Sequence, residues 1–151
     1  MSAQNPSAYS FQNITASLSG PTGVVNFGYG AAVAGEGIEI TMDTEKVTKT
    51  IGADGKGMYS LKANNAGKIK VNLLQTSDEN SALMAIYDSQ SLSAALCGQN
   101  TITVQNSAGS DVWTATQVAF TKRPDYNYKE EGAIVTWEFE AIQIQGAVGT
   151  Y

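Results

Sequence analysis

The run KIKVNLL, residues 68–74, alternates polar and apolar side chains along its whole length. Ile69, Val71 and Leu73 fall on one parity, so a strand over this run would bury one face and leave the other in water. The run Ile134–Ile144 shows the same period over a longer stretch. Two clean half-buried strands of this kind predict a mainly β protein.

Further strands are predicted outward from these two, where short β-branched and aromatic runs are bounded by Gly, Pro, Asn or Asp. These runs are Tyr9–Leu18, Val24–Phe27 after a turn at Gly20–Gly23, Ile38–Met42, Val47–Ile51, Met58–Leu61, Thr101–Val104 and Val112–Phe120. In the first run the apolar side chains change parity, which predicts either a bulge near Gln12 and Asn13 or burial on both faces. We expect Val47–Ile51 to continue the strand before it or to pair with it. No repeat or linker interrupts the chain, which predicts one domain over residues 1–151.

One helix is predicted, within Ser77–Ser93. Ser77 is a good N-cap, and Asp78 and Glu79 fall in the first turn, where the helix dipole favours anions. Leu83 and Ile86 follow at helical spacing, which gives one apolar stripe.

The composition describes a folded protein with little charge. Of its 151 residues, 15% are charged and 42% hydrophobic, and the net charge is −5. A neutral polar surface is cheap to desolvate, which suits a subunit that packs against copies of itself. The acidic balance argues against a protein that grips nucleic acid, although like-charge repulsion would let DNA pass along a negative wall.

Catalytic and cofactor chemistry finds little support. The chain has no histidine, which excludes Ser-His-Asp and Cys-His mechanisms and His-containing zinc sites. Cys97 lacks a local base or cation, so we expect a buried, reduced and inert thiol. The glycines at 52 and 57 lack the Lys and Ser or Thr of a phosphate loop. We expect no enzyme activity, no cofactor and no metal.

Cellular placement follows from two further features of the sequence. Met1–Ala8 lacks the basic and apolar regions of a secretory signal, and no apolar run reaches the roughly 20 residues that span a bilayer. We therefore expect folding in a reducing cytoplasm and no membrane partner.

A family resemblance is carried by several stretches in order along the chain. They are AYSFQN at 8–13, GYGA at 28–31 with EGI at 36–38, IGADG at 51–55, ALM at 82–84, QSLS at 90–93, GQNTITV at 98–104 and the ending GTY at 149–151. Together they resemble the tail tube proteins of contractile-tailed (myovirus-type) bacteriophages over nearly the whole chain.

The resemblance implies a tail-tube-like β-sandwich or barrel with one flanking α-helix. It implies hexameric rings that stack into the hollow inner tube of the virion tail, a conduit for DNA ejection, with the sheath, baseplate and tail terminator proteins as partners. Another tail component, such as a terminator or baseplate subunit, is the alternative. A carbohydrate-binding β-sandwich with Trp113 or Trp137 as the sugar platform is a more distant one.

Two sets of residues are candidates for functional surfaces. Contact between successive rings is expected from a mixed-charge stretch, which contains Asp43, Glu45, Lys46, Lys49, Asp54 and Lys56. Interleaved charges can pair with a neighbour and fix its register. Glu138 and Glu140, on the polar face of the last strand, are candidates for the channel wall.

Overall fold

The computed structural model describes residues 7–150; residues 1–6 and 151 lie outside it, and with them most of the stretch that we searched for a secretory signal. The described part contains nine strands, one α-helix and one short 3₁₀ turn. They are η1 (Phe11–Asn13), β1 (Ile14–Gly20), β2 (Gly23–Asn26), β3 (Val33–Met42), β4 (Val47–Ile51), β5 (Gly57–Leu61), β6 (Gly67–Leu74), α1 (Glu79–Ser91), β7 (Asn100–Asn106), β8 (Asp111–Phe120) and β9 (Ile134–Ala147). The mainly β prediction is confirmed.

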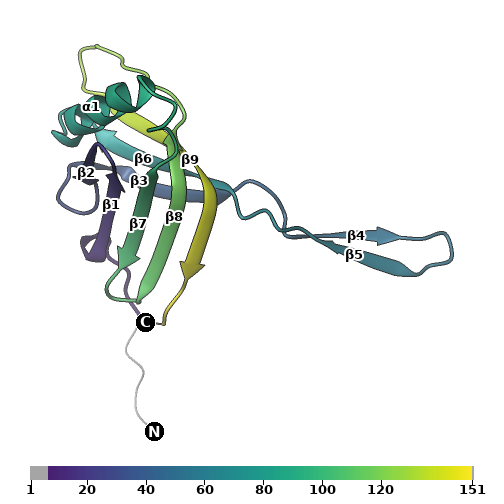
Figure 1. Cartoon of the computed structure of the whole chain (residues 1–151). Coiled ribbons are helices and arrows are strands. Elements are labelled where there is room, and N and C mark those ends of the chain that lie inside the picture. Colours follow the sequence, from purple (N-terminus) through teal and green to yellow (C-terminus); the bar gives the residue numbers. More distant parts are fainter. Residues whose placement is uncertain (1–6, 151) are drawn as a thin grey trace, which may run out of the picture.

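Seven of the strands form one antiparallel sheet in the order β2-β1-β7-β8-β9-β6-β3. The sheet curls into a half-barrel, and α1 lies across one of its ends (Figure 1). The remaining two strands, β4 and β5, pair only with each other and extend away from the half-barrel as a separate hairpin.

The core fills the concave side of the half-barrel. Ile69, Val71 and Leu73 of β6 are buried, as the alternation in the sequence predicts. Val135, Trp137, Phe139 and Ala141 of β9 are buried in the same way. Phe120 packs between two of these rings, with centroids 5.9 Å from Trp137 and 4.9 Å from Phe139. Each such side chain contributes about 1.5–3 kcal/mol by leaving water.

The helix α1 covers the core with Leu83 and Ile86, so the prediction of a helix within Ser77–Ser93 is confirmed. It begins two residues after the expected cap. The Ser77 hydroxyl accepts a hydrogen bond from the Glu79 amide at 3.3 Å and donates one to the Ala31 carbonyl at 2.6 Å. Ser77 therefore joins the start of the helix to the loop before β3.

Two strand predictions were wrong. The first strand begins at Ile14 and not at Tyr9, because the Ser10 hydroxyl accepts from the Gln12 amide at 3.2 Å and starts the 3₁₀ turn over Phe11–Asn13. Val47–Ile51 forms a strand but neither continues β3 nor pairs with it, because the chain leaves the sheet after the Met42–Gly67 pair that ends the β3–β6 ladder, and β4 then pairs with the returning strand β5. Among residues 7–150, no helix has the length and apolar character needed to cross a membrane.

Candidate assembly interface

The hairpin of β4 and β5 is the most exposed part of the described structure; we call residues 46–62 the arm. Its tip closes through the Gly52 amide, which donates to the Lys56 carbonyl at 2.7 Å, and Gly55 takes the positive φ of 85° that the turn needs. Along its two strands every residue is exposed except half-buried Thr48. A two-stranded hairpin without a core is marginally stable alone, which makes the arm a candidate for an interaction surface.

The register of the arm sorts its side chains onto two faces. Val47 lies opposite Leu61, Lys49 opposite Tyr59 and Ile51 opposite Gly57, so these side chains share one face. The other face carries Thr48, Thr50, Met58 and Ser60. On the first face, which we call the apolar face, Tyr59 and Leu61 are 73% and 76% exposed. Hydrophobic side chains this exposed on a hairpin mark an interaction surface.

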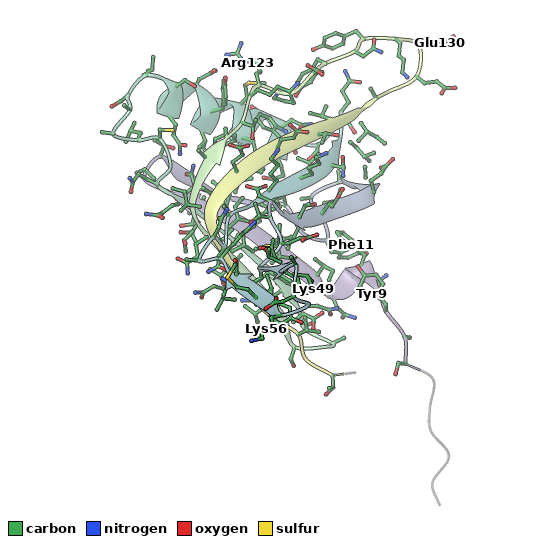
Figure 2. The ribbon with its side chains drawn as sticks, turned by 90° about the vertical axis from the view of Figure 1, so that its right-hand side faces the viewer. Tyr9, Phe11, Lys49, Lys56, Arg123 and Glu130 are labelled. Atoms are coloured by element: carbon green, nitrogen blue, oxygen red, sulfur yellow. The ribbon has the colours of Figure 1, made fainter. Side chains whose placement is uncertain are left out.

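Sequence reasoning missed this apolar face. It selected the charged residues of the stretch, and the structure places Lys46, Lys49, Asp54 and Lys56 on the arm, with Asp43 and Glu45 just before it. Lys49 and Lys56 are labelled in Figure 2. Two of these make contacts within the chain: Lys46 Nζ donates to Asn65 Oδ1 at 2.9 Å, and Asp54 Oδ1 accepts from the Lys56 amide at 3.2 Å. The missed signal was an apolar alternation on both sides of a glycine turn.

Charge is strongly segregated between the arm and the rest of the chain. The arm carries four lysines and one aspartate, a net charge of +3. The other residues carry five basic and thirteen acidic side chains, a net charge of −8, which together with the arm gives the −5 of the whole chain. The arm is thus positive and the rest of the chain negative.

The channel candidates Glu138 and Glu140 lie on the convex side of the sheet, each opposite a lysine of β6. The distance from Lys70 Nζ to Glu138 Oε1 is 3.7 Å, and from Lys68 Nζ to Glu140 Oε1 it is 3.9 Å. Exposed pairs of this kind are worth less than about 1 kcal/mol. This part of the surface therefore presents alternating signs, and the two acids do not form an acidic patch by themselves.

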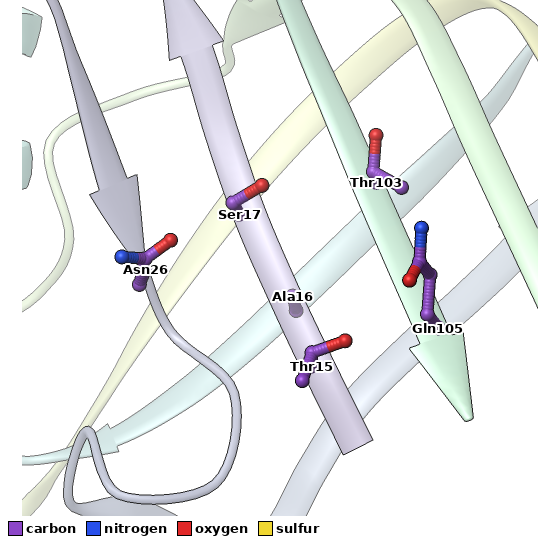
Figure 3. A pocket seen from close by; sticks show the side chains of 6 residues that line it. All are labelled: Thr15, Ala16, Ser17, Asn26, Thr103 and Gln105. Atoms are coloured by element: carbon purple, nitrogen blue, oxygen red, sulfur yellow. The ribbon is translucent and has the colours of Figure 1, made fainter. Parts of the chain in front are cut away.

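The convex surface changes character toward β1 and β7. Thr15 and Ser17 of β1, Thr103 and Gln105 of β7, and Asn26 of β2 line a shallow open hollow of about 140 Å³ (Figure 3). Its lining holds hydroxyl and amide groups and no ionisable side chain. Such a surface can pack against another protein at little desolvation cost, but it offers no acid, base or nucleophile of altered pKa for catalysis.

The prediction that Cys97 is buried was wrong: the side chain is exposed. The residues after α1 form surface turns before β7 and do not return to the core, which leaves the thiol in water. The lack of reactivity that we expected for this thiol stays a prediction.

The aromatic candidates have structural places. Trp137 is fully buried and donates from Nε1 to Asn80 Oδ1 at 3.0 Å, so it cannot serve as a sugar platform. The rings of Tyr126 and Tyr128 stack with their centroids 6.1 Å apart. Partial burial is the main cause that raises the pKa of Tyr126, and the neighbouring Tyr128 phenol is a smaller one. The neighbouring Arg123 is held by Asp88 at 2.8 Å and over the Tyr87 ring at 5.4 Å.

Among the described residues, no group of three or more acidic or cysteine side chains could hold a metal ion. The distinctive feature of the structure is an exposed arm whose charge is opposite to that of the rest of the chain.

Residues 6–149 match the family described as "Bacteriophage PhiTE tail tube protein". The chain belongs to this tail tube family. It is a structural protein family and not an enzyme family.

Solved structures from contractile injection systems share the fold of this chain. A chain of the extended PVC sheath–tube complex superimposes with a TM-score of 0.56 at 13% identity, covering 93% of this chain and 92% of that one. A chain of the PVC sheath/tube terminator superimposes with a TM-score of 0.57 at 15% identity, covering 97% of this chain and 99% of that one. A chain of the six-fold symmetrised anti-feeding prophage baseplate superimposes with a TM-score of 0.58 at 12% identity, covering 95% of this chain and 97% of that one. No curated protein sequence matches this one.

Proposed function

We propose that this tail tube protein forms hexameric rings that stack into the inner tube of a contractile phage tail. The exposed arm is the observation that carries the proposal. Its apolar face has no covering surface among the described residues, and a ring placed above or below would supply one. The six-fold symmetry named for a baseplate of the same fold supports six subunits in a ring.

The residues before and within the arm would make the contact between rings. Lys49 and Lys56 lie on the arm and Asp43 and Glu45 lie before it, so that opposite charges occur close together. These charges would fix the register of one ring on the next, while the apolar face would supply the larger part of the binding energy.

The wall of the tube would carry DNA during ejection without binding it. The net charge of −8 outside the arm favours repulsion of a polyanion. Glu138 and Glu140 remain our candidates for the channel wall, with Lys70 and Lys68 beside them. Sheath, baseplate and terminator proteins would be its partners in the virion tail, after assembly in the host cytoplasm.

A terminator or baseplate role is the second candidate, because structures of a terminator and of a baseplate share this fold as closely as a sheath–tube complex does. Length of assembly separates the candidates. A tube subunit adds ring after ring, whereas a terminator stops at one.

The experiment removes the arm's contacts in two ways. One variant lacks residues 53–56 at the tip, and another carries Lys46→Glu with Lys49→Glu. Negative-stain imaging then compares ring formation with filament length. We expect both variants to form rings that no longer stack, and filaments of normal length from both would refute the role of the arm.

A further inference from the structure

An open groove lies at the end of the half-barrel opposite α1, where β1 and β8 begin and β7 ends. It consists of two adjoining hollows of about 280 and 370 Å³, which share Tyr9, Ile14, Ile38 and Val104 in their linings. Phe11 of the 3₁₀ turn and Trp113 of β8 extend the apolar wall. Tyr9 and Phe11 lie at the N-terminal end of the body in Figure 2.

The groove is apolar but has acidic residues in its lining. Glu36 belongs to one hollow and Asp111 to the other, and neither lining contains Lys or Arg. Glu36 is exposed, whereas Asp111 is half-buried and accepts a hydrogen bond from the Gly149 amide at 2.9 Å through Oδ1. Glu36 is therefore the carboxylate free to meet a cation from outside.

The arm has the complementary properties. Its apolar face exposes Val47, Ile51, Tyr59 and Leu61, and Lys49 stands among them, opposite Tyr59. An apolar surface with one cation matches an apolar groove with a carboxylate in its lining. The arm extends away from its own half-barrel, so the occupant comes from another copy of the chain (Figure 1).

We propose that the apolar face of the arm docks in this groove of a second copy, with Lys49 placed toward Glu36. The inference rests on the proposed stacking of rings and names the surface that receives the arm. It also explains why the groove stays open: the half-barrel keeps a site that only a neighbour fills. Because the arm and groove lie on different parts of the chain, the contact is head-to-tail and can be repeated without limit.

Cross-linking between copies tests the contact. In a Cys97→Ser background, protein with Tyr59→Cys on the arm is mixed with protein carrying Ile38→Cys in the groove, assembled, and treated with a short bis-maleimide. Dimers joining the two variants are expected, with a yield at least about tenfold above a control mixture, because docking holds the two thiols at an effective concentration near the millimolar range. The control replaces Ile38→Cys by Ala85→Cys, an exposed position on α1 at the other end of the body.

A charge exchange tests the pairing without new thiols. Lys49→Glu and Glu36→Lys are each expected to weaken association by about fivefold, and the doubly exchanged protein is expected to regain most of it. Light scattering against protein concentration measures the effect.

The outcomes separate this inference from the proposed function. Filaments that form normally while Tyr59 cross-links no better to Ile38 than to Ala85 would overturn the docking site and leave stacking intact. Failure of the double exchange to restore association would overturn the Lys49–Glu36 pairing. Normal filaments from the variant lacking residues 53–56 and from the Lys46→Glu, Lys49→Glu variant would instead refute the role of the arm itself.

Discussion

Asn100 is a fully buried amide at the boundary between helix and sheet. Its Oδ1 accepts from Gln90 Nε2 at 2.7 Å, while its Nδ2 donates to Gln90 Oε1 at 2.7 Å and to the Val118 carbonyl at 3.0 Å. The pair joins the end of α1 to β7 and β8. Composition alone cannot predict such a pair, because Asn and Gln are common on surfaces as well.

Replacing this amide is expected to destabilise the fold. Asn100→Ala removes the side-chain donor to Gln90 Oε1 and to the Val118 carbonyl, while Gln90 Nε2 keeps only its 3.3 Å contact with Thr22 Oγ1; the loss costs about 2–3 kcal/mol of unfolding free energy. Urea unfolding of dissociated protein measures it, with exposed Gln99→Ala as the matched control. A loss equal to that of the control would contradict the account.

At the scale of elements, the sequence predicts strands and helix where side-chain period alone decides them. Val71 and Trp137 were assigned correctly because burial of one sheet face forces alternation. Residues 9–13 were wrongly assigned to a strand, because the Ser10 side chain starts a local turn that outweighs the β propensity of Tyr9 and Phe11. The partner of β4 was missed because side-chain period shows where a strand lies and not which strand it pairs with; β4 pairs with β5 outside the main sheet.

At Gly28 the segment after β2 approaches the backbone of β1 so closely that no side chain fits between them. A Cβ at this position would lie 2.7 Å from the Ala16 nitrogen and 2.8 Å from the Ile14 carbonyl oxygen, both backbone atoms that cannot easily move. Gly28→Ala is expected to cost about 1–3 kcal/mol by forcing the backbone apart. Gly35→Ala, where a Cβ meets nothing within 4 Å, is the control and is expected to be neutral in thermal unfolding.

The arm separates assembly from folding. Tyr59→Ser combined with Leu61→Ser removes apolar surface that lies outside the core, so the unfolding free energy of dissociated protein should change by less than about 0.5 kcal/mol. Filament formation should be lost, because in the proposed assembly those side chains would be buried only between copies. Thr48→Ala with Ser60→Ala, on the other face, is the matched control. Equal loss of filaments in both variants would argue against the apolar face as the main contact.

For the whole molecule, the segregation of charge between the arm and the rest of the chain would give the proposed assembly a direction and a salt dependence. Screening shortens the reach of these charges from roughly 10 Å at 0.1 M salt to roughly 3 Å at 1 M. We therefore expect the protein concentration needed for filaments to rise as sodium chloride is increased over this range. Sedimentation of filaments at each salt concentration measures this protein concentration. If the concentration needed for filaments falls over the whole salt range, apolar contacts alone determine assembly.

The shape of the assembled protein tests the central claim most directly. The fold and the family were predictable from sequence motifs, but the exposed apolar face of the arm, through which we propose that copies join, required the structure. Electron microscopy of concentrated, purified protein measures the outcome. The account predicts long hollow filaments of uniform diameter built from stacked six-membered rings, with an arm bridging each ring to the next. Isolated single rings or dispersed monomers under all assembly conditions would contradict it.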